Sequence, residues 1–550
     1  MKFKRAVSLL IIACFAAAMF SACEGNNEPD TTSKKSTGTA ASNDIAATGT
    51  KEEVKKVSRE FTYSINIMSA EQAWDKDERL KIVMNKYNIG FNFLPVSWND
   101  WQQKVMIWMS SGDMPDVVWW DMQNTMTKDY YAWVKAGLLK EIKGVEKVEN
   151  VSKYLNVMQK DDFLAVDGKK YAWPCTRDAT VVDNISSRGF VYRKDWAKKL
   201  GLAKDDDVYT WDEMITFAKA CIEKDPGGVG KNKVAGLAAT TWAWPLSLGI
   251  EQLTMSVTDS SSFYKKEDGK YEWCANNPDM LASIKETKKL YDEGIIWKDQ
   301  PLCKGTEPSL KFLAGEIAVM YDNNYTYHLD EFRTKIVKNF KDVKYEDIAL
   351  MKVKAPNGKF TAIKNDENWC VSLFSAKMSD EKLNRLMQAW DWLLSDEGYY
   401  TRAIGIRGVD WEFDGDGIKY LWPIDETTKL YNRPSTSPKA YGPNVWMPIG
   451  VTEGFGFTDP NLEVTNAGKD VYDYSMWCKD NAVFIETDNK LIYFSGPNKD
   501  KYGSFTSEMK DTIVNIILGS KDVDKDWNDF IQSKQDKINL VLDEINNGIK

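Results

Sequence analysis

Residues 110–121 read SSGDMPDVVWWD, a polar turn followed by a run of apolar side chains. Gly112 and Pro115 interrupt regular structure, and residues 117–120 are then all apolar, which is typical of a buried strand. In sheets built from such strands, ligands bind beyond the carboxyl ends. Trp120 and Asp121 therefore lie where a ligand is expected.

The chain before this stretch alternates between strand and helix patterns. Residues 61–67 alternate apolar and polar side chains, residues 91–96 form a second apolar run, and a helical pattern lies between them. Ser97, with Asp100 three residues on, is expected to cap the next helix. One face of that helix carries apolar side chains more typical of a core than of a ligand site: Trp98, Trp101, Val105 and Trp108. Alternating strands and helices predict a parallel sheet, and hence an α/β fold.

A second unit begins after Trp173. Residues 190–192 read as a strand, residues 195–200 as a short helix, and Thr210 with Glu213 as a capping box that opens a helix through Cys221. A further buried strand is predicted at residues 317–320. Ser379 then caps a helix whose apolar face runs to residue 394, and helices dominate the remainder.

The first 57 residues carry targeting patterns. Three cations at positions 2–5 precede an uncharged run from residue 6 to 20, which predicts a signal peptide over residues 1–22. Residues 20–23 resemble a bacterial lipobox, so we expect Cys23 to be the lipid-modified anchor, although Phe20 replaces the usual Leu. The polar residues 23–57 then form a flexible tether.

Composition excludes several classes of function. The chain has 550 residues, and its 72 Lys and Arg face 81 Asp and Glu, so nothing predicts a nucleic-acid partner. His328 is its single histidine, which rules out a two-histidine metal site or a histidine dyad. The 22 Trp, 24 Tyr and 22 Phe exceed what a core usually requires. Such an excess suggests a flat ligand.

The cysteines show no metal or redox motif. Beyond Cys14 and Cys23 the chain has six, and no pair has CxxC spacing. Six cysteines allow 15 disulfide pairings, between which the sequence does not choose. Scattered buried thiols are the simpler interpretation, and we expect mostly free cysteines: Cys175, Cys221, Cys274, Cys303, Cys370 and Cys478.

Four strings occur in an order typical of one protein family: SSGDMPDVVWW, VYRKDWAKKLGL with TWDEM, FLAGEIAVMYDNN, and AWDWLLSDEG. Together they resemble the extracellular solute-binding proteins of bacterial ABC importers, and in particular the lipoproteins that serve oligosaccharide importers. The resemblance implies a two-lobed clamp, with each lobe a mostly parallel sheet flanked by helices and about three crossings between them. It implies a monomer that passes an oligosaccharide to permease subunits on the extracellular face of the membrane. We expect lobe 1 at residues 58–172 and 322–375, and lobe 2 at 173–321 and 376–550.

The resemblance also points to ligand contacts. The second aromatic after the GDxPD turn contacts sugar in related proteins, and here it is Trp120. A second aromatic, ten residues after Gly315, is Tyr325. Three other tryptophans are candidates that could equally be core residues: Trp173 near the first crossing, Trp369 near the third, and Trp446 in a late loop.

Polar side chains flank the two best aromatic candidates. A pyranose ring stacks its C–H face on an aromatic ring, whereas its hydroxyls need donors and acceptors around the rim. Asp121 and Gln123 follow Trp120, and Asn323 and Asn324 precede Tyr325. The two asparagines could instead form only a turn.

We expect no metal and no cofactor. Many relatives carry a calcium loop where this chain has residues 225–236, but Gly227, Val229 and Lys233 stand where oxygen ligands would be needed. Residues 414–417 read DGDG, yet Ile418 and Lys419 break the EF-hand pattern, and the stretch favours a hairpin turn.

Alternatives to a transport receptor stay open. A secreted hydrolase or lyase needs only two suitably spaced carboxylates, although no nucleotide fingerprint or HExxH motif is present. A peptide receptor or a sensory protein would use the same fold. Arg177 is a faint sign of an acidic sugar.

Overall fold

The computed structural model describes most of the chain after residue 58, and residues Arg59–Lys550 form one compact unit. The described residues are 59–68, 77–97, 100–122, 127–158, 164–175, 188–230, 232–241, 263–322, 325–363, 370–403, 405–415, 417–423, 448–449, 468–485, 488–502 and 505–549. The predicted signal peptide, Cys23 and the tether lie outside them.

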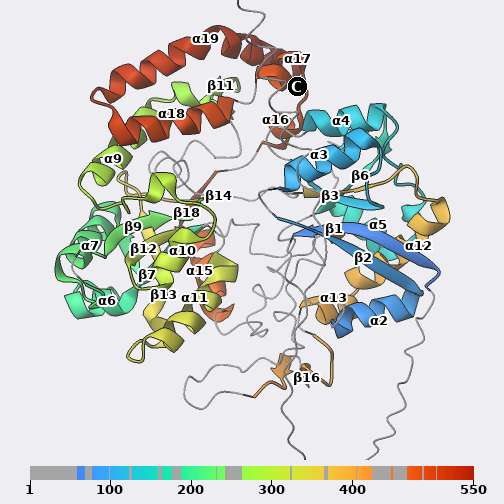
Figure 1. The fold of residues 1–550 in the computed structure, drawn as a ribbon, viewed down its shortest axis with the longest axis horizontal. Coiled ribbons are helices and arrows are strands. Elements are labelled where there is room, and N and C mark those ends of the chain that lie inside the picture. Colours follow the sequence, from blue (N-terminus) through green and yellow to red (C-terminus); the bar gives the residue numbers. More distant parts are fainter. Residues whose placement is uncertain are drawn as a thin grey trace, which may run out of the picture. The chain divides into compact units, whose positions relative to one another are not determined.

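The first sheet has five strands in the order β2-β1-β3-β15-β6 (Figure 1). Their bounds are β1 Phe61–Met68, β2 Ile89–Val96, β3 Val117–Asp121, β6 Ala172–Cys175 and β15 Cys370–Phe374. β1 pairs in parallel with β2 and β3, as the sequence predicts. β15 lies antiparallel between β3 and β6.

Helices cover this sheet: α2 Glu78–Tyr87, α3 Trp101–Ser111, α4 Thr127–Lys135, α5 Glu149–Met158 and α12 Asp380–Leu394. The first core combines Trp101, Val105, Tyr130 and Trp133 with the strands and with the apolar face of α12. One detail differs from expectation, because α3 begins at Trp101 rather than after Ser97. The Ser97 hydroxyl donates to the Asp100 carboxylate at 2.6 Å and accepts from the Asp100 N–H at 3.1 Å, so it binds the residue that directly precedes the helix.

The second sheet has the order β8-β13-β7-β12-β9. Its strands are β7 Gly189–Arg193, β8 Val208–Thr210, β9 Ala235–Ala239, β12 Ile317–Asp322 and β13 Ile348–Lys354. Phe190 and Tyr192 enter one core whereas Val191 enters another, so both faces are covered. Two covered faces explain the unbroken apolar run in β12.

Helices from distant parts of the chain build these two cores: α6 Lys194–Leu200, α7 Trp211–Lys224, α9 Pro278–Asp292, α10 Glu307–Leu313, α11 Tyr325–Asn339, α15 Gly468–Asn481, α18 Phe505–Gly519 and α19 Val523–Gly548. The predicted capping box is present at the start of α7, where Thr210 accepts from the Glu213 N–H. α19 packs on strand β11 (Tyr271–Trp273), and α18 on α9 (Figure 1).

Shorter elements complete the fold. The paired strands are β4 Ala165–Val166 with β5 Lys169–Lys170, β10 Phe263–Lys265 with β11, β14 Phe360–Ile363 with β18 Ala482–Ile485, and β16 Trp411–Asp414 with β17 Gly417–Tyr420. The remaining helices are α13 Asp396–Ala403, α16 Asn489–Tyr493, α17 Pro497–Tyr502, and the 3-10 turns Val145–Lys147, Cys274–Asn276, Gln300–Leu302 and Tyr345–Asp347. β16 and β17 form the hairpin that the sequence predicts at residues 414–417.

Two elements, β13 and α12, belong to a different sheet from the one that the predicted lobe boundaries imply. β13 lies in the second sheet although residues 322–375 are predicted in lobe 1, and α12 packs on the first sheet although residues 376–550 are predicted in lobe 2. β6 pairs with β15, so residues 173–175 also belong to the first sheet. Apolar periodicity predicts a strand or helix face but not the partner that covers it. The first and second lobes are accordingly defined as the first and second sheets with the elements packed on them.

Candidate functional site

At one end of the first sheet, β3 and β6 finish and β15 begins, and this end of the sheet is called the first edge. Asp121, the last residue of β3, is the Cα partner of Cys370, which begins β15, and Cys370 is also the partner of Cys175, which ends β6. Asp121 is partly exposed there. Gln123 and Trp369 lie outside the described residues, two and one positions along the chain from this edge. Asp121 is the described member of this group, and the ligand contacts expected of Asp121, Gln123 and Trp369 stay predictions.

Trp120 itself is fully buried next to this edge. Its ring meets Trp101 edge-on, with centroids 6.3 Å apart, and Trp133 at 5.2 Å. The indole Nε1 has no acceptor within the part of the chain that the structure describes. This geometry favours a packing role, and the predicted sugar contact of Trp120 stays a prediction.

Trp173 is likewise buried, and it anchors another segment. Its ring stacks on Tyr154 at 5.0 Å, and its Nε1 donates to the Ile449 carbonyl at 2.9 Å. Next to it, the Ser372 hydroxyl donates to the Pro448 carbonyl at 2.6 Å. Residues 448–449 are thereby fixed against β6 and β15. Trp446, which lies outside the described residues, is two positions from Pro448.

The second sheet presents a corresponding edge where β12 ends. Asp322 is the partner of Gly189, and Tyr321 is the partner of Ala239 at the end of β9. Tyr325, predicted as a ligand contact, is buried and meets Tyr474 edge-on at 5.0 Å, which also favours packing. A Cβ at position 189 would lie 3.0 Å from the Tyr474 hydroxyl, so glycine suits this position. Asn323 lies outside the described residues.

The single histidine occupies this second edge, although no sequence pattern marks it as functional. His328 Nδ1 lies 2.9 and 3.0 Å from the two carboxylate oxygens of Asp322, which is fully buried. The imidazole is 27% exposed, so it reaches the surface. Proximity to Asp322 in the chain could have suggested this pair, but the contact depends on α11 starting directly after β12.

The motif at residues 110–121 is held by scaffold contacts. The Asp116 carboxylate accepts from the Ser64 N–H at 2.9 Å and from the Lys382 ammonium at 2.7 Å. It therefore ties the turn before β3 to β1 and to α12. Gly112 ends α3 with a φ of 70°, a conformation that favours glycine.

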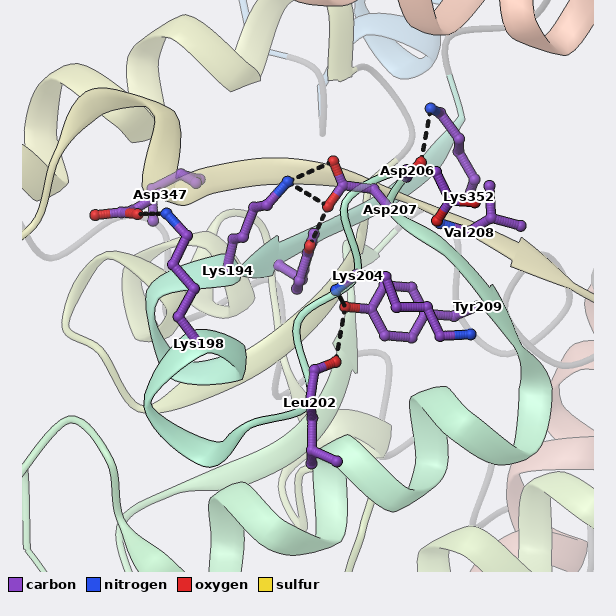
Figure 2. Close-up of polar contacts among 12 residues, drawn as sticks. Lys194, Lys198, Leu202, Lys204, Asp206, Asp207, Val208, Tyr209, Asp347 and Lys352 are labelled. Carbon is purple, nitrogen blue, oxygen red and sulfur yellow. Dashed lines mark hydrogen bonds and ion pairs between the residues drawn. The ribbon is translucent and has the colours of Figure 1, made fainter.

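The motif at residues 190–201 is also structural. Arg193 forms a buried ion pair with Asp195 at 2.6 Å, and its guanidinium lies 4.5 Å from the Trp196 ring centroid. Figure 2 shows how the neighbouring charges pair: Lys194 with Asp207, Lys198 with Asp347, and Lys352 with the carbonyl of Asp206. These contacts fasten α6 to β8 and β13. They give the motif a role in positioning the second sheet.

The loop that corresponds to a calcium site in many relatives is closed by its own backbone. Asp225 accepts hydrogen bonds from the N–H groups of Val229 at 3.0 Å and Gly230 at 2.8 Å. Both carboxylate oxygens thus face backbone donors, which repel a cation. Among the described residues, no group of three or more His, Cys, Asp or Glu side chains is arranged to hold a metal ion.

The six described cysteines are free, as expected. Burial raises the pKa of the Cys175, Cys274 and Cys478 thiols to about 12. These thiols are therefore protonated and unreactive at neutral pH, which suits packing rather than nucleophilic chemistry.

Comparison with known proteins connects this fold to a family. Residues 68–398 match the family described as bacterial extracellular solute-binding protein. The chain belongs to this family. The solute-binding protein is 26% identical over 368 residues to lipoprotein LipO of Bacillus subtilis (strain 168), covering 64% of this chain and 67% of LipO. It is 25% identical over 345 residues to the polygalacturonan/rhamnogalacturonan-binding protein YtcQ of the same organism, covering 58% of this chain and 64% of YtcQ.

Solved structures agree with the fold of this solute-binding protein. Alginate-binding protein AlgQ2, solved without calcium ion, has a TM-score of 0.64 at 17% identity, and the match covers 89% of this chain and 98% of AlgQ2. FusA of Streptococcus pneumoniae in complex with kestose has a TM-score of 0.59 at 16% identity, covering 88% and 98%. The expected two-lobed α/β fold is confirmed. In the described part of the chain, no helix is both long and apolar enough to cross a bilayer.

Proposed function

We propose that this solute-binding protein captures an oligosaccharide between the two sheet edges and presents it to an ABC permease without cleaving it. One observation carries the proposal: the strand ends of each sheet that bear Asp121 and Asp322 lead directly into the segments with the predicted ligand residues. In α/β sheets these ends are the usual place for ligands.

The relatives support a carbohydrate. YtcQ is named for binding polygalacturonan and rhamnogalacturonan, and FusA was solved with kestose. We propose that Gln123, Asn323, Trp369 and Trp446 join Asp121 around the sugar. Trp120, Trp173 and Tyr325 then support these residues from the core and do not contact the sugar, because their rings are buried. The protein works as a monomer, and the lipid on Cys23 holds it at the outer face of the membrane.

A thermal-shift screen of the chain from residue 59 onward tests the proposal. Neutral oligosaccharides, uronic-acid oligosaccharides and peptides are each added, and every hit is recovered and analysed for cleavage. A ligand at a hundredfold excess over its dissociation constant adds about 2.7 kcal/mol to the free energy of unfolding, which gives a measurable shift. An intact oligosaccharide supports the proposal. Shortened fragments would establish an enzyme, and a peptide hit would exclude the carbohydrate.

A site variant sharpens this test. Asp121→Ala removes a carboxylate from the first edge and is expected to weaken sugar binding by about 1.5 to 3 kcal/mol. Asp511→Ala, on the exposed face of α18, is the matched control and leaves affinity unchanged. Equal affinities of the two variants would remove Asp121 from the site. Cys23→Ser tests the anchor, because the protein should then appear in the medium.

A further inference from the structure

The short helix α16 contributes side chains to both lobes. Leu491 packs in the core of the second sheet, whereas the next two residues, Ile492 and Tyr493, pack in the core of the first. All three are at least 95% buried. Among the described residues, α16 is the element whose own side chains enter cores on both sheets.

Hydrogen bonds fasten α16 to each lobe as well. The Tyr131 hydroxyl on α4 donates to the carbonyl of Tyr493 at 3.3 Å. The Tyr271 hydroxyl on β11 donates to the carboxylate of Asp488 at 2.5 Å, and Asp488 in turn caps α16 by accepting from the Leu491 N–H. The helix is therefore held by the first lobe at its end and by the second lobe at its start.

Lys499 closes the end of this helix. Its ammonium donates to the carbonyls of Leu491 at 2.6 Å, Ile492 at 3.2 Å and Phe494 at 2.6 Å. The last carbonyls of a helix have no partners within the helix, and a helix C-terminus favours a cation. Three charge-assisted hydrogen bonds on a five-residue helix make Lys499 its main polar constraint.

The lysine is itself held by the second lobe. Its backbone N–H donates to the Glu544 carboxylate of α19 at 2.8 Å, and the N–H of Asn498 donates to the same carboxylate. Glu544 therefore fixes α17, Lys499 of α17 fixes α16, and α16 reaches into the first core. This chain of contacts connects the lobes through packed, described residues.

We propose that Lys499 is a positioning residue for lobe closure, because it keeps α16 in the conformation in which the helix packs against both lobes. The proposal rests on the proposed function only in its effect on sugar affinity. Without the lysine, the carbonyls at the end of α16 lose their donors, the helix frays, and the angle between the lobes is less defined. A less organised receptor binds its ligand more weakly, because ordering it on binding costs free energy.

The test compares Lys499→Met, which keeps the side-chain length but has no donor, with Lys521→Met at an exposed site. Hydrogen exchange of the amides at 489–494 and small-angle scattering are measured without ligand, and sugar affinity by calorimetry. We expect Lys499→Met to lose at least tenfold in amide protection, to increase the radius of gyration, and to bind sugar about tenfold more weakly. Lys499→Arg, which retains donors, should restore part of the protection.

Each result decides the proposal. Wild-type protection and an unchanged radius of gyration in Lys499→Met would overturn it, whatever the ligand. If no sugar binds the wild type, the proposed function fails, but the exchange and scattering data still decide the role of Lys499. Should Lys499→Met not fold, Tyr131→Phe removes one hydrogen bond of α16 without a large cavity, and it should raise exchange at 489–494 by a smaller factor. Unchanged exchange there would contradict the proposal.

Discussion

Replacing Trp120 by alanine separates the two roles that this side chain can have. The indole is fully buried between Trp101 and Trp133, so its removal leaves a cavity in the first core. Truncating a buried tryptophan in this way costs about 3 to 5 kcal/mol of unfolding free energy. If the ring packs and does not bind, the affinity of the folded variant for sugar should change little.

Trp120→Phe refines the expectation. The Nε1 of Trp120 has no acceptor within the described part of the chain, and a buried unpaired donor costs about 1 to 3 kcal/mol. Phenylalanine removes that donor but also part of the packing, so the two effects should cancel to within about 1.5 kcal/mol. Trp108→Ala, at a partly exposed position of α3, is the matched control and should cost about 1 kcal/mol.

The assay is urea unfolding followed by circular dichroism, with sugar titrations of the folded variants. A Trp120→Ala protein whose unfolding free energy stays within about 1 kcal/mol of the wild type, and which loses more than tenfold in affinity, would refute the packing argument. The resemblance to sugar-binding relatives would then be the better guide to this residue.

Three further predictions concern loops, thiols and pH. Asp225→Ala should lower the unfolding free energy by about 1 to 3 kcal/mol, because the hydrogen bonds from Val229 and Gly230 are lost. Calcium should leave the melting temperature of the wild type unchanged. An increase in melting temperature on adding calcium would show a metal site. At pH 8 the buried thiols of Cys175, Cys274 and Cys478 should resist alkylation in the native state and react in urea, and fast native labelling at these positions, mapped by mass spectrometry, would contradict their burial. Burial lowers the pKa of Lys499 from 10.5 to about 8, so between these values the unfolded chain binds more protons, and this lysine makes the unfolding free energy rise with pH. The difference in unfolding free energy between wild type and Lys499→Met should therefore change from about pH 8 to 10.5, and a constant difference would exclude the shift.

The sequence predicts local structure well because local chemistry determines it. The alternation at residues 61–67 and the capping box at Thr210 each depend on neighbours within a few positions, and both are confirmed. The partner of each strand depends on contacts across hundreds of residues. β13 is apolar enough for either sheet, and its pairing with β7 and β8 assigns it to the second.

The candidate site is harder to predict for a related reason. A tryptophan at the end of a buried strand fits a core and a sugar site equally well by sequence, and only the positions of Trp101 and Trp133 around Trp120 favour the core. The motifs that carry the resemblance have structural explanations, since Asp116 binds Lys382 of α12 and Arg193 forms a buried ion pair with Asp195 inside its own motif. A shared scaffold says little about which solute it binds.

The packing of α19 on β11 has a consequence for how the chain folds. The Asn546 side chain accepts from the Tyr271 N–H across 275 residues of sequence, and Trp527 and Phe530 of the same helix close the core over Trp273. Contacts between such distant positions form late, because the loop between them must first be ordered. The second lobe therefore cannot complete its native core until α19 is present and packed on β11, whereas the core of the first sheet contains no residue of α19.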